Sequence, residues 1–159
     1  MNFYKKITLL IDKPKKIYKF ANEKMTMTNP KVENYIKEAI NTKGIIDLNG
    51  KDFDSLLNSG DKAQTFLENG SGDSALNDVL AAIEKDAKQK GINIFDSKKI
   101  LTSISISSKE NAINSFMTAK LEAINEFIAR FGEDFELKWG LYSSPALQED
   151  EVRVLLITC

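Results

Sequence analysis

The sequence predicts an α/β (α+β) domain in which two helices pack on one face of a four-stranded sheet, preceded by an N-terminal strand and helix lead-in. Two observations predict this fold. Apolar stripes with helical spacing alternate along the chain with short segments whose apolar residues recur at every second position. From residue 63 onward the order is strand, helix, strand, helix, strand, strand, and the two helical stripes need a sheet face to bury them.

The first 43 residues form the lead-in. Phe3–Ile11 combines aromatic and β-branched residues, which predicts a strand, and residues 17–25 predict a short helix. An Asn-Pro pair at 29–30 is typical of a helix start, because Asn caps the first turn and Pro is tolerated at its first position. Gly44 stands where that helix should end. We therefore divide the chain into a lead-in, residues 1–43, and a compact domain, residues 44–159.

The compact domain is predicted to contain strands at residues 63–67, 99–107, 135–142 and 152–158. A short helix is predicted at residues 52–57. Two longer helices are predicted: one is capped by Asp73 or Ser74 and stopped by Gly91, and the other covers residues 113–131. The stripe of the last helix includes Phe116 and Met117. Strand 99–107 alternates isoleucine with serine, which predicts a buried face with Ile104 and Ile106 and an exposed face with the serines. The final strand is nearly all apolar, which predicts a central position covered on both faces.

Composition excludes several kinds of chemistry. The chain has no histidine and one cysteine, Cys159, which excludes histidine triads, histidine metal sites and a structural zinc site. No glycine-rich phosphate loop of standard spacing is present. The net charge of −1 favours neither nucleic acid nor an anionic membrane, and no apolar run approaches the roughly 20 residues that span a bilayer. We expect no cofactor, no metal, no nucleic-acid or membrane partner and, without a visible secretory signal, a cytoplasmic location.

The segment KGIIDLNGKDFDSLL, residues 43–57, holds the candidate site residues Asp47, Asn49 and Asp52. Asn followed by Gly is a turn signal, and Asp near a helix start is a common cap. These residues can therefore shape the loop, or they can form a contact surface, and the sequence leaves both interpretations open.

The order and spacing of several motifs together resemble the C-terminal domain of FtsZ, the bacterial tubulin-like division GTPase, from about Lys43 to Cys159. Residues 44–53, GIIDLNGKDF, are similar to the family's loop G-L-I-N-L-D-F-A-D-V. Residues 100–105, ILTSIS, resemble its strand V-L-x-N-I-T. Trp139-Gly140 and the strand over residues 152–158, VRVLLIT, resemble its closing pattern W-G … R-V-T-V-I-A-T-G.

The resemblance implies an FtsZ C-terminal-like domain without the GTP-binding domain, because the 43 residues before the loop hold no phosphate loop. It therefore implies no GTPase activity and no enzyme function. Tyr18 and Asn22 have the spacing of the family's guanine-stacking Phe and guanine-binding Asn. They are either a remnant of the nucleotide site or ordinary helix surface.

In FtsZ filaments this loop is inserted against the nucleotide of the next subunit, where two aspartates help to polarise the attacking water. By position these aspartates are Asn49 and Asp52 here, and the preceding Asn is Asp47. An amide cannot accept a proton as a carboxylate does, which argues against catalysis in trans. The resemblance implies protein–protein contact, with itself or with an FtsZ/tubulin-like filament, in cell division. The alternatives are a small-ligand-binding or regulatory α/β module that kept the fold only, or a fragment of a longer FtsZ-like protein.

Overall fold

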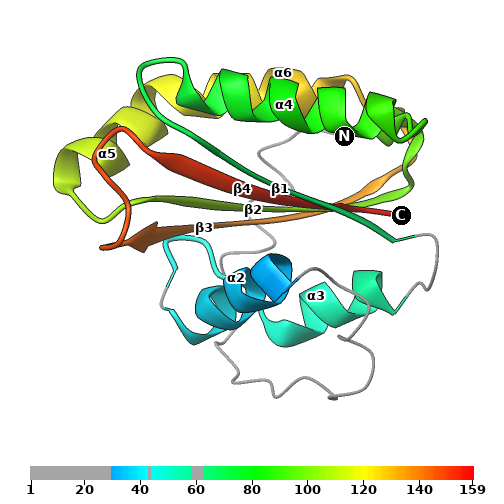
Figure 1. Ribbon diagram of the computed structural model, residues 1–159, viewed down its shortest axis with the longest axis horizontal. Helices are drawn as coiled ribbons and strands as arrows, with labels where there is room; N and C mark the ends of the chain where they lie inside the picture. The colour runs from blue at the N-terminus through cyan, green and yellow to red at the C-terminus, as the bar shows by residue number, and fades with distance from the viewer. Residues whose placement is uncertain (1–29, 43, 59–62) are drawn as a thin grey trace.

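Four strands and two layers of helix make up the part of the chain that the structure, a computed structural model, describes: residues 30–42, 44–58 and 63–159 (Figure 1). In chain order the elements are α2 (Pro30–Asn41), α3 (Gly50–Leu57), β1 (Gln64–Gly70), α4 (Ala75–Gln89), the 3-10 helix η3 (Ile94–Asp96), β2 (Lys99–Ser107), α5 (Glu110–Ser115), the π-helical segment η4 (Phe116–Lys120), α6 (Leu121–Ala129), β3 (Glu136–Ser144) and β4 (Val152–Thr158). The predicted fold class is confirmed. The predicted strand Phe3–Ile11 and the helix at residues 17–25 lie outside the described residues.

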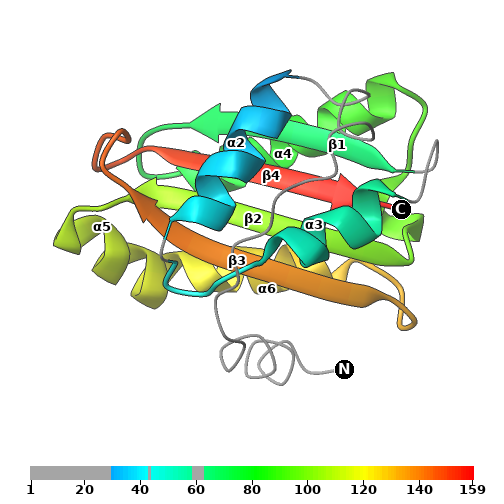
Figure 2. The same ribbon diagram turned by 90° about the horizontal axis from the view of Figure 1, so that it is seen from below.

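The sheet has the strand order β1-β4-β2-β3. β4 is antiparallel to β1 and to β2, whereas β2 and β3 are parallel. The apolar last strand is therefore interior to the sheet, as predicted. Because only β4 runs in the opposite direction, the carboxyl ends of the other three strands lie at the same end of the sheet (Figure 2).

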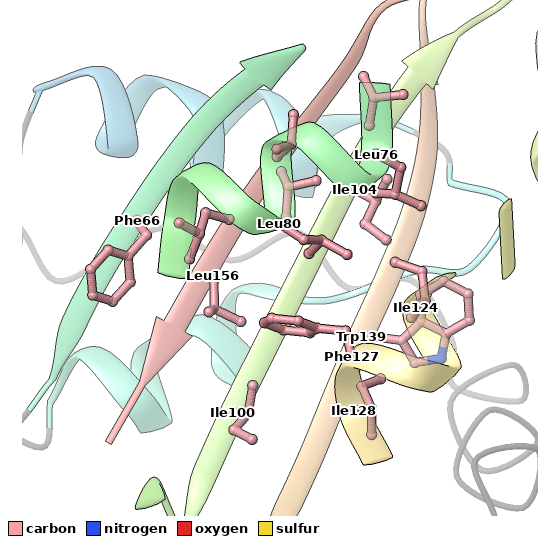
Figure 3. Packing of buried hydrophobic residues seen from close by; sticks show 14 of the residues in the cluster. Phe66, Leu76, Leu80, Ile100, Ile104, Ile124, Phe127, Ile128, Trp139 and Leu156 are labelled. Atoms are coloured by element: carbon pink, nitrogen blue, oxygen red, sulfur yellow. The ribbon is translucent and has the colours of Figure 1, made fainter. Parts of the chain in front are cut away.

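One face of the sheet is covered by α4 and by the continuous helix of α5, η4 and α6, which we call the upper layer (Figure 1). The buried side chains that meet there, shown in Figure 3, include Leu80, Ile104, Ile124, Trp139 and Leu156. Removing a side chain of this size from water stabilises the fold by roughly 1.5–3 kcal/mol. The alternation of β3 places its apolar residues on this face, as the sequence predicts.

A π-helical turn interrupts the last helix and corrects one prediction. Phe116 is fully buried, but Met117, which the sequence assigns to the same apolar stripe, is 44% exposed. A π turn holds one more residue than an α turn, so it rotates the stripe and turns Met117 toward solvent.

The other face of the sheet is covered by α2 and α3, which form the lower layer (Figure 1). α2 lies within the range 1–43, and its buried residues Val32 and Ile36 belong to the same core cluster as Leu101 and Leu155 of the sheet. The sheet is therefore buried on both faces.

This lower layer overturns the prediction that the serines of β2 are exposed. Ser103, Ser105 and Ser107 are at most 4% exposed, and Ser103 and Ser105 face Tyr35 of α2 rather than water. The Tyr35 hydroxyl of α2 lies 3.1 Å from the Ser103 Oγ and 3.0 Å from the Ser105 Oγ, and it donates to the Ser103 carbonyl oxygen at 3.1 Å. The Tyr142 hydroxyl also contacts the Ser103 Oγ. Burial raises the pKa of Tyr35, so the phenol stays neutral.

Replacing Tyr35 by Phe should remove the centre of this hydroxyl network while leaving the ring in place. We expect the free energy of unfolding to fall by about 1–2 kcal/mol, because two buried serine hydroxyls lose a partner. Urea unfolding measures this change. Ser74→Ala, which removes an exposed hydroxyl that contacts Asp78, is the control and should alter stability by less than about 0.5 kcal/mol. Equal stability of the Tyr35→Phe variant and the wild type would contradict the role of the network.

α4 ends at Gln89, and Gly91 is the stop residue after its cap Lys90, as the sequence predicts. Gly91 has φ +72°, its N–H donates to the Lys88 carbonyl oxygen at 3.0 Å, and the Ile92 N–H donates to the Ala87 carbonyl oxygen at 2.9 Å. This pair of bonds satisfies the last carbonyls of the helix and needs a left-handed residue after the cap.

Gly91→Ala should lower the free energy of unfolding by about 1 kcal/mol, because a Cβ disfavours the left-handed conformation. The position is open, and a Cβ added there would meet nothing within 4 Å beyond its chain neighbours, so steric crowding does not contribute. Gly91→Asn should be milder than Gly91→Ala, since Asn tolerates this conformation better. Thermal unfolding of both variants tests the ranking, and an alanine variant at least as stable as the asparagine variant would contradict it.

Candidate functional site

The segment between α2 and α3, residues 44–49, runs along the outer side of β3 and is called the α2–α3 loop (Figure 2). Ile46 and Leu141 form an antiparallel bridge, with each N–H donating to the other's carbonyl oxygen at 2.9 Å. The Ile45 N–H also donates to the Leu141 carbonyl oxygen, at 2.8 Å. These bonds fix the first half of the loop to the sheet.

Gly140 allows this close approach. A Cβ at Gly140 would lie 2.7 Å from Leu48 Cγ and 3.1 Å from the Ile46 carbonyl oxygen. Its neighbour Trp139 is buried in the upper layer, so the Trp-Gly pair puts a large ring on one face and leaves space for the loop on the other.

Asp47 turns inward on its own loop. Its Oδ1 accepts a hydrogen bond of 2.6 Å from the Gly44 N–H, and the side chain is partly buried. A Cβ at Gly44 would lie 2.7 Å from that oxygen and 3.1 Å from the Ile46 and Leu141 carbonyl oxygens, so a larger residue would crowd the turn. Asp47 therefore closes the turn that begins the loop.

Asn49 and Asp52 form a capping box at the start of α3. The Asn49 Oδ1 accepts from the Asp52 N–H at 3.0 Å, and the Asp52 Oδ2 accepts from the Asn49 N–H at 3.0 Å. The second oxygen of Asp52, Oδ1, lies 3.1 Å from the Lys138 Nζ on β3. Asp52 is 3% exposed. Both carboxylate oxygens thus contact groups of this chain, and the turn-and-cap interpretation of these two residues is what the geometry shows.

One apolar side chain of the α2–α3 loop is exposed to solvent. Ile45 is 40% exposed and is, with Met117, one of two large hydrophobic residues that the structure shows exposed among its described residues. The other two candidate residues, Tyr18 and Asn22, lie outside the described residues.

A hollow of about 720 Å³ lies at the end of the sheet where β1, β2 and β3 finish. Its walls come from the start of α4, from α5 and η4, and from residues 148–150, and they include Lys109 and Lys120. Across the described ranges, no group of three acidic or cysteine side chains is arranged to hold a metal ion. The helices of these ranges are all too short or too polar to cross a bilayer.

The fold defines an FtsZ-like α/β domain, and the resemblance found in the sequence is confirmed by solved structures. No family model matches the sequence, and no curated protein matches it. The similarity is to the C-terminal region of FtsZ. It is shown by structure at low identity, so it establishes the fold alone.

Two FtsZ structures from M. jannaschii match 86% of this chain: an empty FtsZ dimer, at 17% identity and a TM-score of 0.54, and a W319Y mutant, at 18% identity and a TM-score of 0.57. This chain spans 43% and 44% of the lengths of those two chains. A GDP-bound CetZ1 monomer from Haloferax volcanii matches 89% of this chain and 42% of its own, at 9% identity and a TM-score of 0.41.

Sequence reasoning missed two residues that shape the site, Lys138 and Gly140. Both alternate with the apolar residues of β3, so both belong to the face opposite the predicted core. A two-layer fold would leave that face in water, and only a second helical layer gives Lys138 and Gly140 something to contact. A glycine inside a strand was the available signal, because it often marks close approach of another backbone.

Gly140→Ala should lower the free energy of unfolding by about 1–3 kcal/mol and displace the α2–α3 loop, because the new methyl group overlaps Leu48. Urea unfolding measures the stability, and amide exchange at Ile46 and Leu141 reports on the loop. Gly132→Ala is the control, since a Cβ there meets nothing within 4 Å. Protected Ile46 and Leu141 amides in Gly140→Ala would contradict the requirement for glycine.

Proposed function

We propose that this chain acts by protein–protein contact through the α2–α3 loop, binding a second copy of itself or an FtsZ/tubulin-like filament in the cytoplasm, with a role in cell division. The observation that carries the proposal is an exposed Ile45 on a loop whose backbone is bonded to β3. The FtsZ-like fold supports the choice of partner, and one of the similar structures is described as a dimer.

A fixed loop is suited to contact because little conformational entropy is lost when it binds. The Ile45 N–H is bonded to the sheet edge, so the exposed side chain projects from an ordered backbone. Apolar side chains that become fully desolvated at the centre of an interface carry much of the binding energy. Ile45 is the exposed apolar side chain of the loop, and the proposed contact would bury it.

The proposal includes no GTP hydrolysis by this chain. Asp52, which occupies the position of a water-polarising aspartate in FtsZ, caps α3 and contacts Lys138 instead. Asn49 supplies an amide where the other aspartate would stand. These two features support a contact role rather than a catalytic one for the loop.

Ile45→Asp tests the proposed contact. We expect the purified wild-type protein to self-associate in analytical ultracentrifugation or to alter FtsZ sedimentation, and Ile45→Asp to reduce the effect at least about tenfold, because a carboxylate would be buried in the interface. Met117→Asp, at the other exposed hydrophobic position, is the matched control and should behave as wild type. The proposal fails if the wild type neither self-associates nor changes FtsZ assembly, or if Ile45→Asp retains the full effect.

A second candidate function is that of a small-ligand-binding or regulatory module. The observation that favours it is a hollow of about 540 Å³ between α2 and the edge of the sheet. The hollow is lined by residues of both charges, among them Lys31, Glu38, Glu68 and Arg153. A thermal-shift screen against nucleotides and metabolites distinguishes the two functions, since a specific ligand raises the unfolding temperature by mass action.

A further inference from the structure

The lower face of β3 contacts the α2, loop and α3 segments in order. Its residues at every second position face this layer, whereas Leu137, Trp139 and Leu141 face the upper layer. Four contacts follow one another along the strand: the Ser144 Oγ donates to the Glu38 Oε1 of α2 at 3.4 Å, the Tyr142 ring lies 5.9 Å from the Tyr35 ring of α2, Gly140 faces Leu48 of the loop, and the Lys138 Nζ lies 3.1 Å from the Asp52 Oδ1 of α3.

Of these four contacts, the one made by Lys138 is with a candidate site residue, Asp52. Asp52 accepts from the Asn49 N–H through Oδ2 and faces Lys138 through Oδ1, so one carboxylate joins the end of the α2–α3 loop to the sheet. Lys138 also lies 3.9 Å from Glu136, whose side chain is 58% exposed. The Asp52 pair is both shorter and more buried, so removing Lys138 should cost more through Asp52 than through Glu136, because it leaves a buried carboxylate without that ammonium.

We propose that Lys138 is the positioning residue of the α2–α3 loop: its ammonium holds Asp52 in the capping box and so presents the loop in one conformation for binding. The effect of Lys138 on binding rests on the proposed contact function, whereas its effect on the loop does not. Lys138 acts through Asp52 and needs no contact with the partner.

The electrostatics give the direction of the effect. A carboxylate at 3% exposure needs a counter-charge or several donors, and Lys138 supplies the charge. Without the ammonium, Asp52 gains by moving toward water, which removes the acceptor of the Asn49 N–H and opens the first turn of α3. The α2–α3 loop then loses this attachment at its end and keeps the hydrogen bonds of Ile45 and Ile46 to Leu141.

Lys138→Met tests this directly, because it keeps the length of the side chain and removes the charge. We expect the amides of Asn49 and Asp52 to exchange at least about tenfold faster than in the wild type, while Leu155 in the interior strand keeps its rate. Lys138→Arg should restore slow exchange. Glu136→Gln is the matched control and should leave both amides protected.

A double variant separates charge from packing. In Lys138→Met the buried Asp52 carboxylate loses the Lys138 ammonium, so adding Asp52→Asn should slow the exchange of the Asn49 backbone amide again, since an amide oxygen still caps and carries no charge. A packing role for the lysine stem would show no such rescue. The same comparison remains decisive if Lys138→Met alone is too unstable to purify, because the double variant should then fold.

Binding assays distinguish failure of this inference from failure of the proposed function. Wild-type exchange rates at Asn49 and Asp52 in Lys138→Met would overturn the positioning role, whatever happens to association. Faster exchange together with weaker association, with Leu155 unchanged, supports both proposals. Faster exchange in a protein that shows no association even as wild type supports the positioning role and overturns the contact function.

Discussion

Burial of both faces of the sheet is the constraint on which the rest of the structure depends. The polar groups of a strand that lies between two helical layers are removed from water, and a partner inside the protein offsets the cost of burying them. Ser103 and Ser105 find theirs in the Tyr35 hydroxyl of α2. The Asp52 carboxylate of α3 accepts a hydrogen bond from the Asn49 backbone N–H and lies beside the Lys138 ammonium. Polar groups in the lower layer thus become the links that fix α2 and α3 to the sheet.

The upper layer could be predicted from sequence because the spacing of apolar residues within each element shows which side is buried. Trp139 and Leu141 stand at strand spacing, and α4 carries a helical stripe that ends at a glycine, so period alone indicates which side of each element is buried. The lower layer could not be predicted in the same way. Serines at every second position give the same sequence pattern whether they face water or a tyrosine hydroxyl. The tyrosine that buries them, Tyr35, lies 68 residues before Ser103, so no local pattern reveals it.

In the candidate site, too, local interactions could be predicted from the sequence and long-range ones could not. Asn49 and Asp52 are three residues apart, which is the spacing of a capping box, so their capping role is readable from the sequence. Lys138 is far along the chain, and its part in the same arrangement follows only from the pairing of β3 with β2. The exposure of Met117 could not be predicted either, because no local sequence pattern indicates the π turn that places it toward solvent.

Within the α2–α3 loop, internal and external tasks belong to different residues. The polar side chains that a comparison with FtsZ singles out hold the loop together: Asp47 closes its first turn, and Asn49 and Asp52 start α3. In the proposed contact, the loop presents Ile45, whose backbone N–H donates to the Leu141 carbonyl oxygen. For the proposed contact, the favourable free energy therefore comes from burying apolar area on an ordered backbone, and the carboxylates contribute by keeping that backbone ordered.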